Sequence, residues 1–192
     1  MSTRMIVMTK LIVNDIDSMS IVMALTGKPV PDFLLTSTDD QQVNLASLKG
    51  ISVVYAYPRI SPPDQPSIDG WDDIPGAKGC TIQSRGFATN YGVIIGAGAS
   101  HVYGLSTQLT GVQKEAVERL HLPFHLLSDH QMDVAHHLGL PRFNVGQLTL
   151  LSRITLVIEE GIIKKVFFPV HNAAKNAALV AKYLMTEQSS SS

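Results

Sequence analysis

The 192-residue chain contains a single cysteine, Cys80, and little charge: charged residues make up 16% and the formal net charge is −1. One cysteine cannot form an internal disulfide, so the fold does not rest on a disulfide framework. The modest, balanced charge excludes a highly charged disordered chain and provides no basic surface for nucleic acid. No apolar run approaches the roughly 20 residues that span a bilayer. We therefore expect a soluble, cytoplasmic protein with no nucleic-acid partner and no membrane partner.

Hydrophobic residues are plentiful, at 45% of the chain. At this length they support one globular domain. Residues 1–26 are methionine-rich and are expected to form an N-terminal extension, without the continuous apolar stretch of a secretory signal. The methionine-rich composition gives way at Gly27 to a proline-containing extended segment, and residues 27–186 are predicted to form the domain. The serine-rich residues 187–192 are predicted to be a disordered tail.

The order of the predicted elements indicates an α/β protein. A β-branched and aromatic run at 51–57 is typical of a strand buried on both faces. It follows a predicted hairpin at 33–45 and a single helical turn at 46–50. Further strands are predicted at 101–106, 123–127, 150–158 and 162–168, and helices at 81–91, 110–120, 131–138 and 173–184. This order predicts a thioredoxin-like fold, a three-layer sandwich with a central mixed β-sheet flanked by helices.

The segment that leads to the cysteine carries the strongest chemical signal. Residues 58–79 contain five prolines and the only tryptophan, Trp71, and so long an irregular connection in a compact domain is usually functional. It delivers the chain to Cys80 at the predicted start of a helix, where backbone N–H groups and the helix dipole favour a thiolate. A lone cysteine is also often a small buried apolar residue. This segment alone leaves both interpretations open.

Two other patterns are weaker. Gly96-Ala97-Gly98 looks like part of a dinucleotide-binding loop, but a strand is predicted after it, where phosphate binding requires a helix. A flexible connection between a helix and a strand is therefore the favoured interpretation. The seven histidines show no ligand spacing, since His136 and His137 are adjacent and point to different sides of a helix. We predict no metal site and no cofactor.

Six segments between residues 27 and 184 form an ordered set: GKPVPDF at 27–33, VYAYPR at 54–59, GCT at 79–81, VYGLS at 102–106, PFHLLSD at 123–129 and RITLVI at 153–158. In this order they resemble the peroxiredoxins, thiol peroxidases of the AhpC/TSA group with a thioredoxin fold. Among these, the set is most similar to the bacterioferritin-comigratory-protein type. Each segment is a weak signal alone, and the ordered set is fairly specific.

The resemblance implies a thiol-dependent peroxidase that reduces hydrogen peroxide or organic hydroperoxides. Cys80 would attack the peroxide and become a sulfenic acid. Arg153 would hold the thiolate and stabilise charge that develops on the peroxide oxygens. The resemblance further implies a substrate-binding pocket formed by Gly79, Thr81, Pro75 and Pro58.

Three positions depart from the family pattern. Ala77 stands where the family usually has a threonine whose hydroxyl helps to seat the peroxide, and Asp73 stands where it usually has a proline. Arg85 occupies the position of the resolving cysteine that many members carry. The resemblance therefore implies a one-cysteine variant, recycled by an external thiol reductant of the thioredoxin, glutaredoxin or glutathione type, and a homodimer. The alternative, favoured by the missing threonine, is a catalytically weak thioredoxin-fold redox sensor or binding protein.

Overall fold

The computed structural model describes residues 17–66, 68–71 and 79–190. The helices are α2 (Cys80–Gly96), α3 (Thr110–Leu120), α4 (Asp133–Leu138) and α5 (Ala173–Ser190), and a further helix covers residues 17–25. The strands are β1 (Leu35–Ser37), β2 (Gln42–Val43), β3 (Ile51–Ala56), β4 (Ala99–Ser106), β5 (His125–Ser128), β6 (Arg142–Val145), β7 (Leu148–Leu151), β8 (Ile154–Glu159) and β9 (Ile162–Phe167).

Seven of these strands form one mixed sheet in the order β2-β1-β5-β4-β3-β8-β9, while β6 and β7 pair separately as an antiparallel hairpin. Strands β3, β4 and β5 run parallel, and β8 pairs antiparallel to β3. Parallel neighbours need crossover connections, and α2 and α3 supply them. The run predicted as a strand buried on both faces is β3, and its position between β4 and β8 confirms that prediction.

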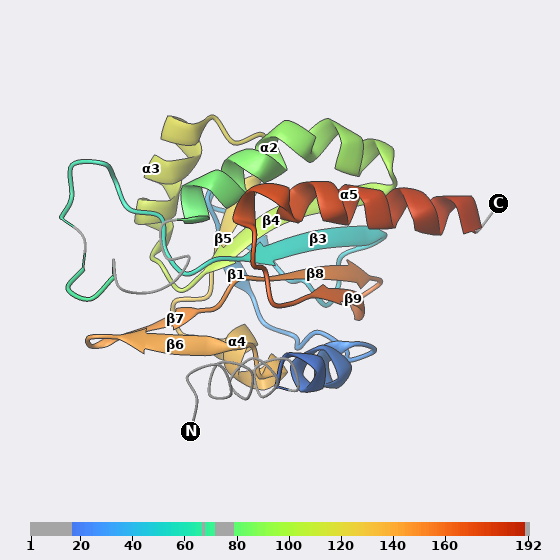
Figure 1. The fold of residues 1–192 in the computed structure, drawn as a ribbon, viewed down its shortest axis with the longest axis horizontal. Helices are drawn as coiled ribbons and strands as arrows, with labels where there is room; N and C mark the ends of the chain where they lie inside the picture. The colour runs from blue at the N-terminus through green and yellow to red at the C-terminus, as the bar shows by residue number, and fades with distance from the viewer. Residues whose placement is uncertain (1–16, 67, 72–78, 191–192) are drawn as a thin grey trace, which may run out of the picture.

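Helices cover both faces of the sheet (Figure 1). Helices α2, α3 and α5 pack on one face over Val53 and Tyr55 of β3. Helix α4 and the helix at 17–25 pack on the other, over Val54 and Ala56. Successive side chains of a strand point to opposite faces, so one apolar strand supplies both cores. The three-layer sandwich and the thioredoxin-like fold are confirmed.

Helix α2 is longer than predicted. It continues to Gly96 rather than ending near residue 91. Glycine is a poor helix former, and the sequence analysis placed a flexible connection to the next strand after residue 91. Phe87 and Ile94 are fully buried on the inner side of the helix, and this packing outweighs the weak local propensity. The connection between helix and strand is therefore only residues 97–98, and no helix follows it at which a nucleotide phosphate could bind.

The predicted strand at 150–158 is two strands. It is interrupted at Ser152 and Arg153, which separate β7 from β8. The first part pairs with β6 in a hairpin that the sequence did not indicate, and the second part joins the central sheet. Trp71, only 7% exposed, packs on this hairpin against Val145 and Leu150. The hairpin therefore anchors part of the long connection that precedes Cys80.

The structure adds detail at both ends of the described chain, and at the C-terminal end it differs from the prediction. Helix α5 runs through Ser190, so residues 187–190 of the predicted disordered tail are helical. The hydroxyls of Ser189 and Ser190 donate to carbonyls four residues earlier, at 3.0 and 3.1 Å. At the other end, Leu25 is buried in the core beside α4. The described part of the N-terminal extension thus packs on the domain, and residues 1–16 and 191–192 lie outside the described residues.

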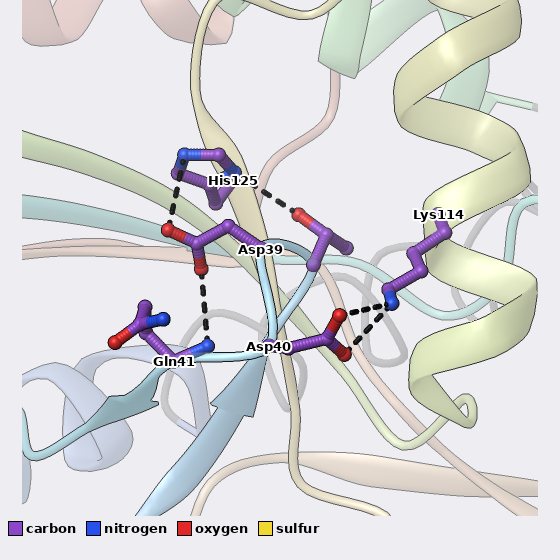
Figure 2. A network of polar contacts seen from close by, with 6 residues as sticks. Asp39, Asp40, Gln41, Lys114 and His125 are labelled. Carbon is purple, nitrogen blue, oxygen red and sulfur yellow. Dashed lines mark hydrogen bonds and ion pairs between the residues drawn. The ribbon is translucent and has the colours of Figure 1, made fainter.

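Two smaller local predictions have different outcomes. Strands β1 and β2 form the predicted hairpin around the acidic turn. Figure 2 shows how that turn is held: Asp40 forms an ion pair with Lys114 of α3 at 2.6 Å, and Asp39 lies 3.5 Å from His125 of β5. Residues 45–47 form a turn, so the predicted helical turn at 46–50 is wrong.

Gly104 lies on β4 where a side chain has no room. A Cβ there would lie 2.5 Å from Cδ2 of Leu126 and 2.9 Å from Cζ of Tyr55. We expect Gly104→Ala to lower the free energy of unfolding by about 1–3 kcal/mol through overpacking, measured by chemical denaturation. Gly92→Ala is the matched control. A Cβ at this glycine of α2 would meet nothing within 4 Å, so the added methyl should stabilise the helix by about 0.5–1 kcal/mol. Equal effects of the two variants would contradict the packing of β4.

Candidate active site

Cys80 is the first residue of α2, as the sequence predicts. Gly79 precedes the helix as its N-cap and provides no side-chain hydrogen bond to the exposed backbone N–H groups. The cysteine residue is only 2% exposed. Its thiol therefore lies at the positive end of a helix and inside the core on the α2 face of the sheet.

Arg153 lies next to the sulfur. Its Nη1 atom donates to Sγ of Cys80 at 3.1 Å, across 73 positions of sequence. Arg153 occupies the break between β7 and β8, immediately before the strand that pairs with β3. The fold therefore brings together the two residues that the sequence analysis put forward as catalytic.

A second donor comes from the segment that follows β3. The backbone N–H of Arg59 donates to Sγ of Cys80 at 3.5 Å. Arg59 follows Pro58, which is buried. Within the part of the chain that the structure describes, the sulfur thus accepts a hydrogen bond from a charged side chain and another from the main chain, and both favour a negatively charged sulfur.

Burial opposes these donors. Removal of the thiol from water disfavours the thiolate and raises the pKa of Cys80 above its ordinary value, against the lowering effect of the Arg153 charge and the Arg59 N–H. This is opposite to the direction expected from the helix N-terminus alone, because the sequence could not show that the thiol is almost completely buried. The site therefore combines donors that stabilise a thiolate with burial that opposes its formation.

A buried polar network extends from the arginine into α5. Nη1 of Arg153 also donates to Oε1 of Gln83 at 3.3 Å, and Nε2 of Gln83 donates to Oδ1 of Asn176 at 3.0 Å. The same Asn176 oxygen accepts from the hydroxyl of Thr155 at 2.8 Å. Gln83, Asn176 and Thr155 are each at most 2% exposed. Through Gln83 of α2, the guanidinium is linked to Asn176 of α5 and, through Asn176, to Thr155 of β8.

The sequence analysis did not identify Gln83, Asn176 or Arg59 as parts of this site. Gln83 lies three residues after Cys80, and residues at that spacing share a helix face, so a signal was present for it. Asn176 is one of several polar residues in the alanine-rich helix α5. Only the packing of α5 on α2 shows that its side chain contacts Gln83. Arg59 acts through its backbone, which leaves no residue-type signal.

The four predicted substrate-binding residues have different positions. Gly79 lies against Arg153, since a Cβ there would be 3.2 Å from Nη2 of that arginine and 3.1 Å from Cβ of Ala173. Thr81 is partly exposed in the first turn of α2, and Pro58 is buried beside Arg59. Pro75 lies outside the described residues, as do the departures Asp73 and Ala77.

The family follows from comparison with known proteins. The model of the Redoxin family matches residues 25–181. The chain belongs to the Redoxin family, as a peroxiredoxin with one cysteine. Peroxiredoxin bcp1 of Schizosaccharomyces pombe is 32% identical over 125 residues, which are 64% of this chain and 55% of that protein. The chloroplastic peroxiredoxin Q of Oryza sativa subsp. japonica is 33% identical over 143 residues, which are 73% and 58% of the two chains. This peroxiredoxin therefore spans a little over half the length of these curated relatives.

Solved structures agree on the fold. Peroxidoxin BcpB of Mycobacterium tuberculosis superposes with a TM-score of 0.68 at 24% identity, and the match covers 84% of this chain and 96% of that one. The bacterioferritin comigratory protein of Xanthomonas campestris, studied for its alkyl peroxide reduction activity, gives a TM-score of 0.65 at 20% identity, with 82% and 93% of the two chains covered. At these identities the likeness establishes the thioredoxin-like fold of this peroxiredoxin.

Three further observations concern a resolving residue, a metal site and a membrane span. Arg85, at the position of the resolving cysteine, is exposed on α2. No three His, Cys, Asp or Glu side chains among the described residues gather closely enough to hold a metal ion. Within residues 17–66, 68–71 and 79–190, no helix has both the length and the apolar character needed to cross a membrane.

Replacement of Arg153 tests the electrostatics of this peroxiredoxin. We expect Arg153→Met to raise the pKa of Cys80 by about one unit or more, because the variant keeps the apolar stem and loses the charge that opposes burial. The ultraviolet absorbance of the thiolate, corrected with Cys80→Ser in the same background, measures the pKa. The control is Arg142→Met, which removes an exposed arginine of β6. Equal pKa values for Arg153→Met and the wild type would contradict the contact.

Replacement of Asn176 tests the buried network. We expect Asn176→Ala to lower the free energy of unfolding by about 2–4 kcal/mol, because two buried donors lose their shared acceptor. Thr155→Val removes one of those donors, so combining it with Asn176→Ala should cost less than the sum of the single effects. Chemical denaturation measures each term, and exposed Lys175→Ala is the control on the same helix. Strictly additive losses would show that these side chains do not form one network.

Proposed function

We propose that this chain is a thiol-dependent peroxidase with Cys80 as the nucleophile and Arg153 as its electrostatic partner. The observation that carries the proposal is the 3.1 Å contact between Arg153 Nη1 and Cys80 Sγ at the start of a helix. A lone buried cysteine needs no charged donor at its sulfur, whereas a thiolate nucleophile does. Family membership and the alkyl peroxide reduction of a structural neighbour support the same reaction.

In the oxidative half of the reaction, the Cys80 thiolate attacks one oxygen of the peroxide. A sulfur–oxygen bond forms, the oxygen–oxygen bond breaks, and the leaving oxygen takes a proton and departs as water or an alcohol. The sulfur is oxidised to a sulfenic acid. The Arg153 guanidinium stays charged throughout, so it stabilises the thiolate and then the negative charge on the separating oxygens.

The reductive half requires a thiol from another molecule. Its sulfur attacks the sulfenic sulfur of Cys80, water leaves, and a mixed disulfide forms. A second thiol attacks that mixed disulfide, which returns Cys80 to its reduced state and releases an oxidised disulfide. One peroxide and two thiols thus yield one water or alcohol, one further water and one disulfide.

Peroxide contact is assigned to the backbone at the start of α2 and to the residues around it. The half-buried Gly79 beside Arg153 and the partly exposed Thr81 support this assignment, and Pro58 adjoins the Arg59 donor. The assignment of Pro75 rests on the family resemblance. The proposal also includes a cytoplasmic location, a homodimer and a reductant of the thioredoxin, glutaredoxin or glutathione type. These parts rest on family membership and composition.

One observation favours the alternative of a slow redox sensor. Burial holds the pKa of Cys80 above its ordinary value, and the thiol form reacts poorly with peroxide. A sensor needs one oxidation event with a lasting product, whereas an enzyme needs repeated turnover. The two functions therefore differ in what happens after the sulfenic acid forms.

The test combines single oxidation with turnover. Reduced protein is mixed with hydrogen peroxide or an organic hydroperoxide, and the sulfenic acid at Cys80 is followed by mass spectrometry. Peroxide consumption is followed with added glutathione or thioredoxin. We expect oxidation at Cys80, repeated turnover with thiol, and neither in Cys80→Ser. Because the pKa of the thiol is raised, the thiolate fraction and hence the oxidation rate should rise about tenfold per pH unit below that pKa.

Each failure of this test has a distinct meaning. Oxidation without turnover would replace the peroxidase with the sensor. Oxidation no faster than that of glutathione at the same pH would remove both functions. Turnover that survives in Cys80→Ser would remove Cys80 as the nucleophile, and a rate independent of pH would contradict the raised pKa.

A further inference from the structure

Gln108, in the loop between β4 and α3, holds the segment that carries the main-chain donor to the sulfur. Its Nε2 atom donates to the carbonyl of Ile60 at 2.9 Å, and its Oε1 atom accepts from the N–H of Ile60 at 2.9 Å. One side-chain amide therefore satisfies both backbone groups of one residue, as a neighbouring strand would. Ile60 is itself only 2% exposed.

The backbone of Gln108 is held by hydrogen bonds to two strands of the central sheet. The N–H of Gln108 donates to Oγ of Ser106 at 3.3 Å, and its carbonyl accepts from Oγ of Ser128 at 2.6 Å. Ser106 and Ser128 are the last residues of β4 and β5. The position of the Gln108 backbone is thus set by the ends of two parallel strands at the centre of the fold.

The Arg59 N–H lies between two such anchors. On one side, the N–H of Tyr57 donates to the carbonyl of Leu105 at 3.0 Å. On the other side, Gln108 fixes Ile60. Pro58, between Tyr57 and Arg59, restricts its own backbone φ angle. With both ends held and one torsion restricted, few backbone conformations remain that change the direction of the Arg59 N–H, which donates to Cys80 Sγ at 3.5 Å.

We propose that Gln108 is a positioning residue that clamps Ile60 so that the backbone N–H of Arg59 is aimed at the sulfur of Cys80. The role of this donor in catalysis rests on the proposed peroxidase function, but the effect on the sulfur does not require turnover. A residue that only stabilised the loop would change the unfolding free energy and leave the ionisation of the thiol unchanged.

The test replaces Gln108 with leucine, which fills similar space and forms neither hydrogen bond. The thiolate absorbance of the reduced variant, as the whole 192-residue chain, is titrated and corrected with the same variant carrying Cys80→Ser. We expect the apparent pKa of Cys80 to rise by roughly half a unit, which lowers the oxidation rate near neutral pH about two- to threefold. The rate at pH values above the pKa should stay within about twofold of the wild type. Gln108→Asn keeps the amide on a shorter side chain that cannot reach both groups, so it should shift the pKa in the same direction.

Lys28→Met is the matched control. Lys28 also clamps two backbone groups, the carbonyls of His137 and Leu138, at 3.2 and 3.1 Å, on the α4 side of the sheet. The Lys28→Met substitution should leave the pKa of Cys80 unchanged. An unchanged pKa in both Gln108 variants would overturn the proposal, as would an equal shift in Lys28→Met. If Gln108→Leu shifts the pKa of Cys80 but the wild-type protein does not turn over peroxide, the positioning role of Gln108 is supported and the proposed peroxidase function is contradicted.

Discussion

The structure around Cys80 depends on one conflict: a sulfur that becomes negatively charged in the proposed reaction is held almost entirely away from water. Burial alone would keep the thiol protonated, and the charge of Arg153 at 3.1 Å is the main force that opposes it. Arg153 lies in the break between β7 and β8, and its guanidinium reaches the start of α2. Gly79 lets the two pack closely, because a Cβ there would lie 3.2 Å from Nη2 of the guanidinium and press against it.

The C-terminal helix takes part in this arrangement as well as in the core. Asn176 of α5 accepts hydrogen bonds from Gln83 and Thr155, and Gln83 in turn accepts one from Arg153. Apolar side chains between the same helices, such as Phe87 and Val180, exclude water from this network. Hydrogen bonds in such surroundings are strong, and their loss is costly. The geometry at the sulfur is therefore coupled to how α5 docks on α2.

The sequence predicts those parts of the site that depend on local pattern or on ordered family segments. Cys80 at a helix start and a buried central strand at β3 follow from the long irregular connection at 58–79 and the β-branched run at 51–57. Arg153 enters through the resemblance, because no local pattern links it to a residue 73 positions away. The hairpin of β6 and β7, the full length of α2 and the role of Asn176 depend on tertiary packing, which composition does not encode. The direction of the Cys80 pKa was missed for the same reason.

The depth of the sulfur has a consequence for which molecules can meet it. At 2% exposure, Cys80 is out of reach of any bulky thiol in the conformation described. A small peroxide needs only a narrow path, but a protein reductant must bring its own sulfur into contact with the sulfenic acid. In the proposed reaction, reduction by a protein thiol therefore demands a larger local opening around the first turn of α2 than oxidation does. Burial of the sulfur thus gives the two halves of the proposed reaction different steric requirements.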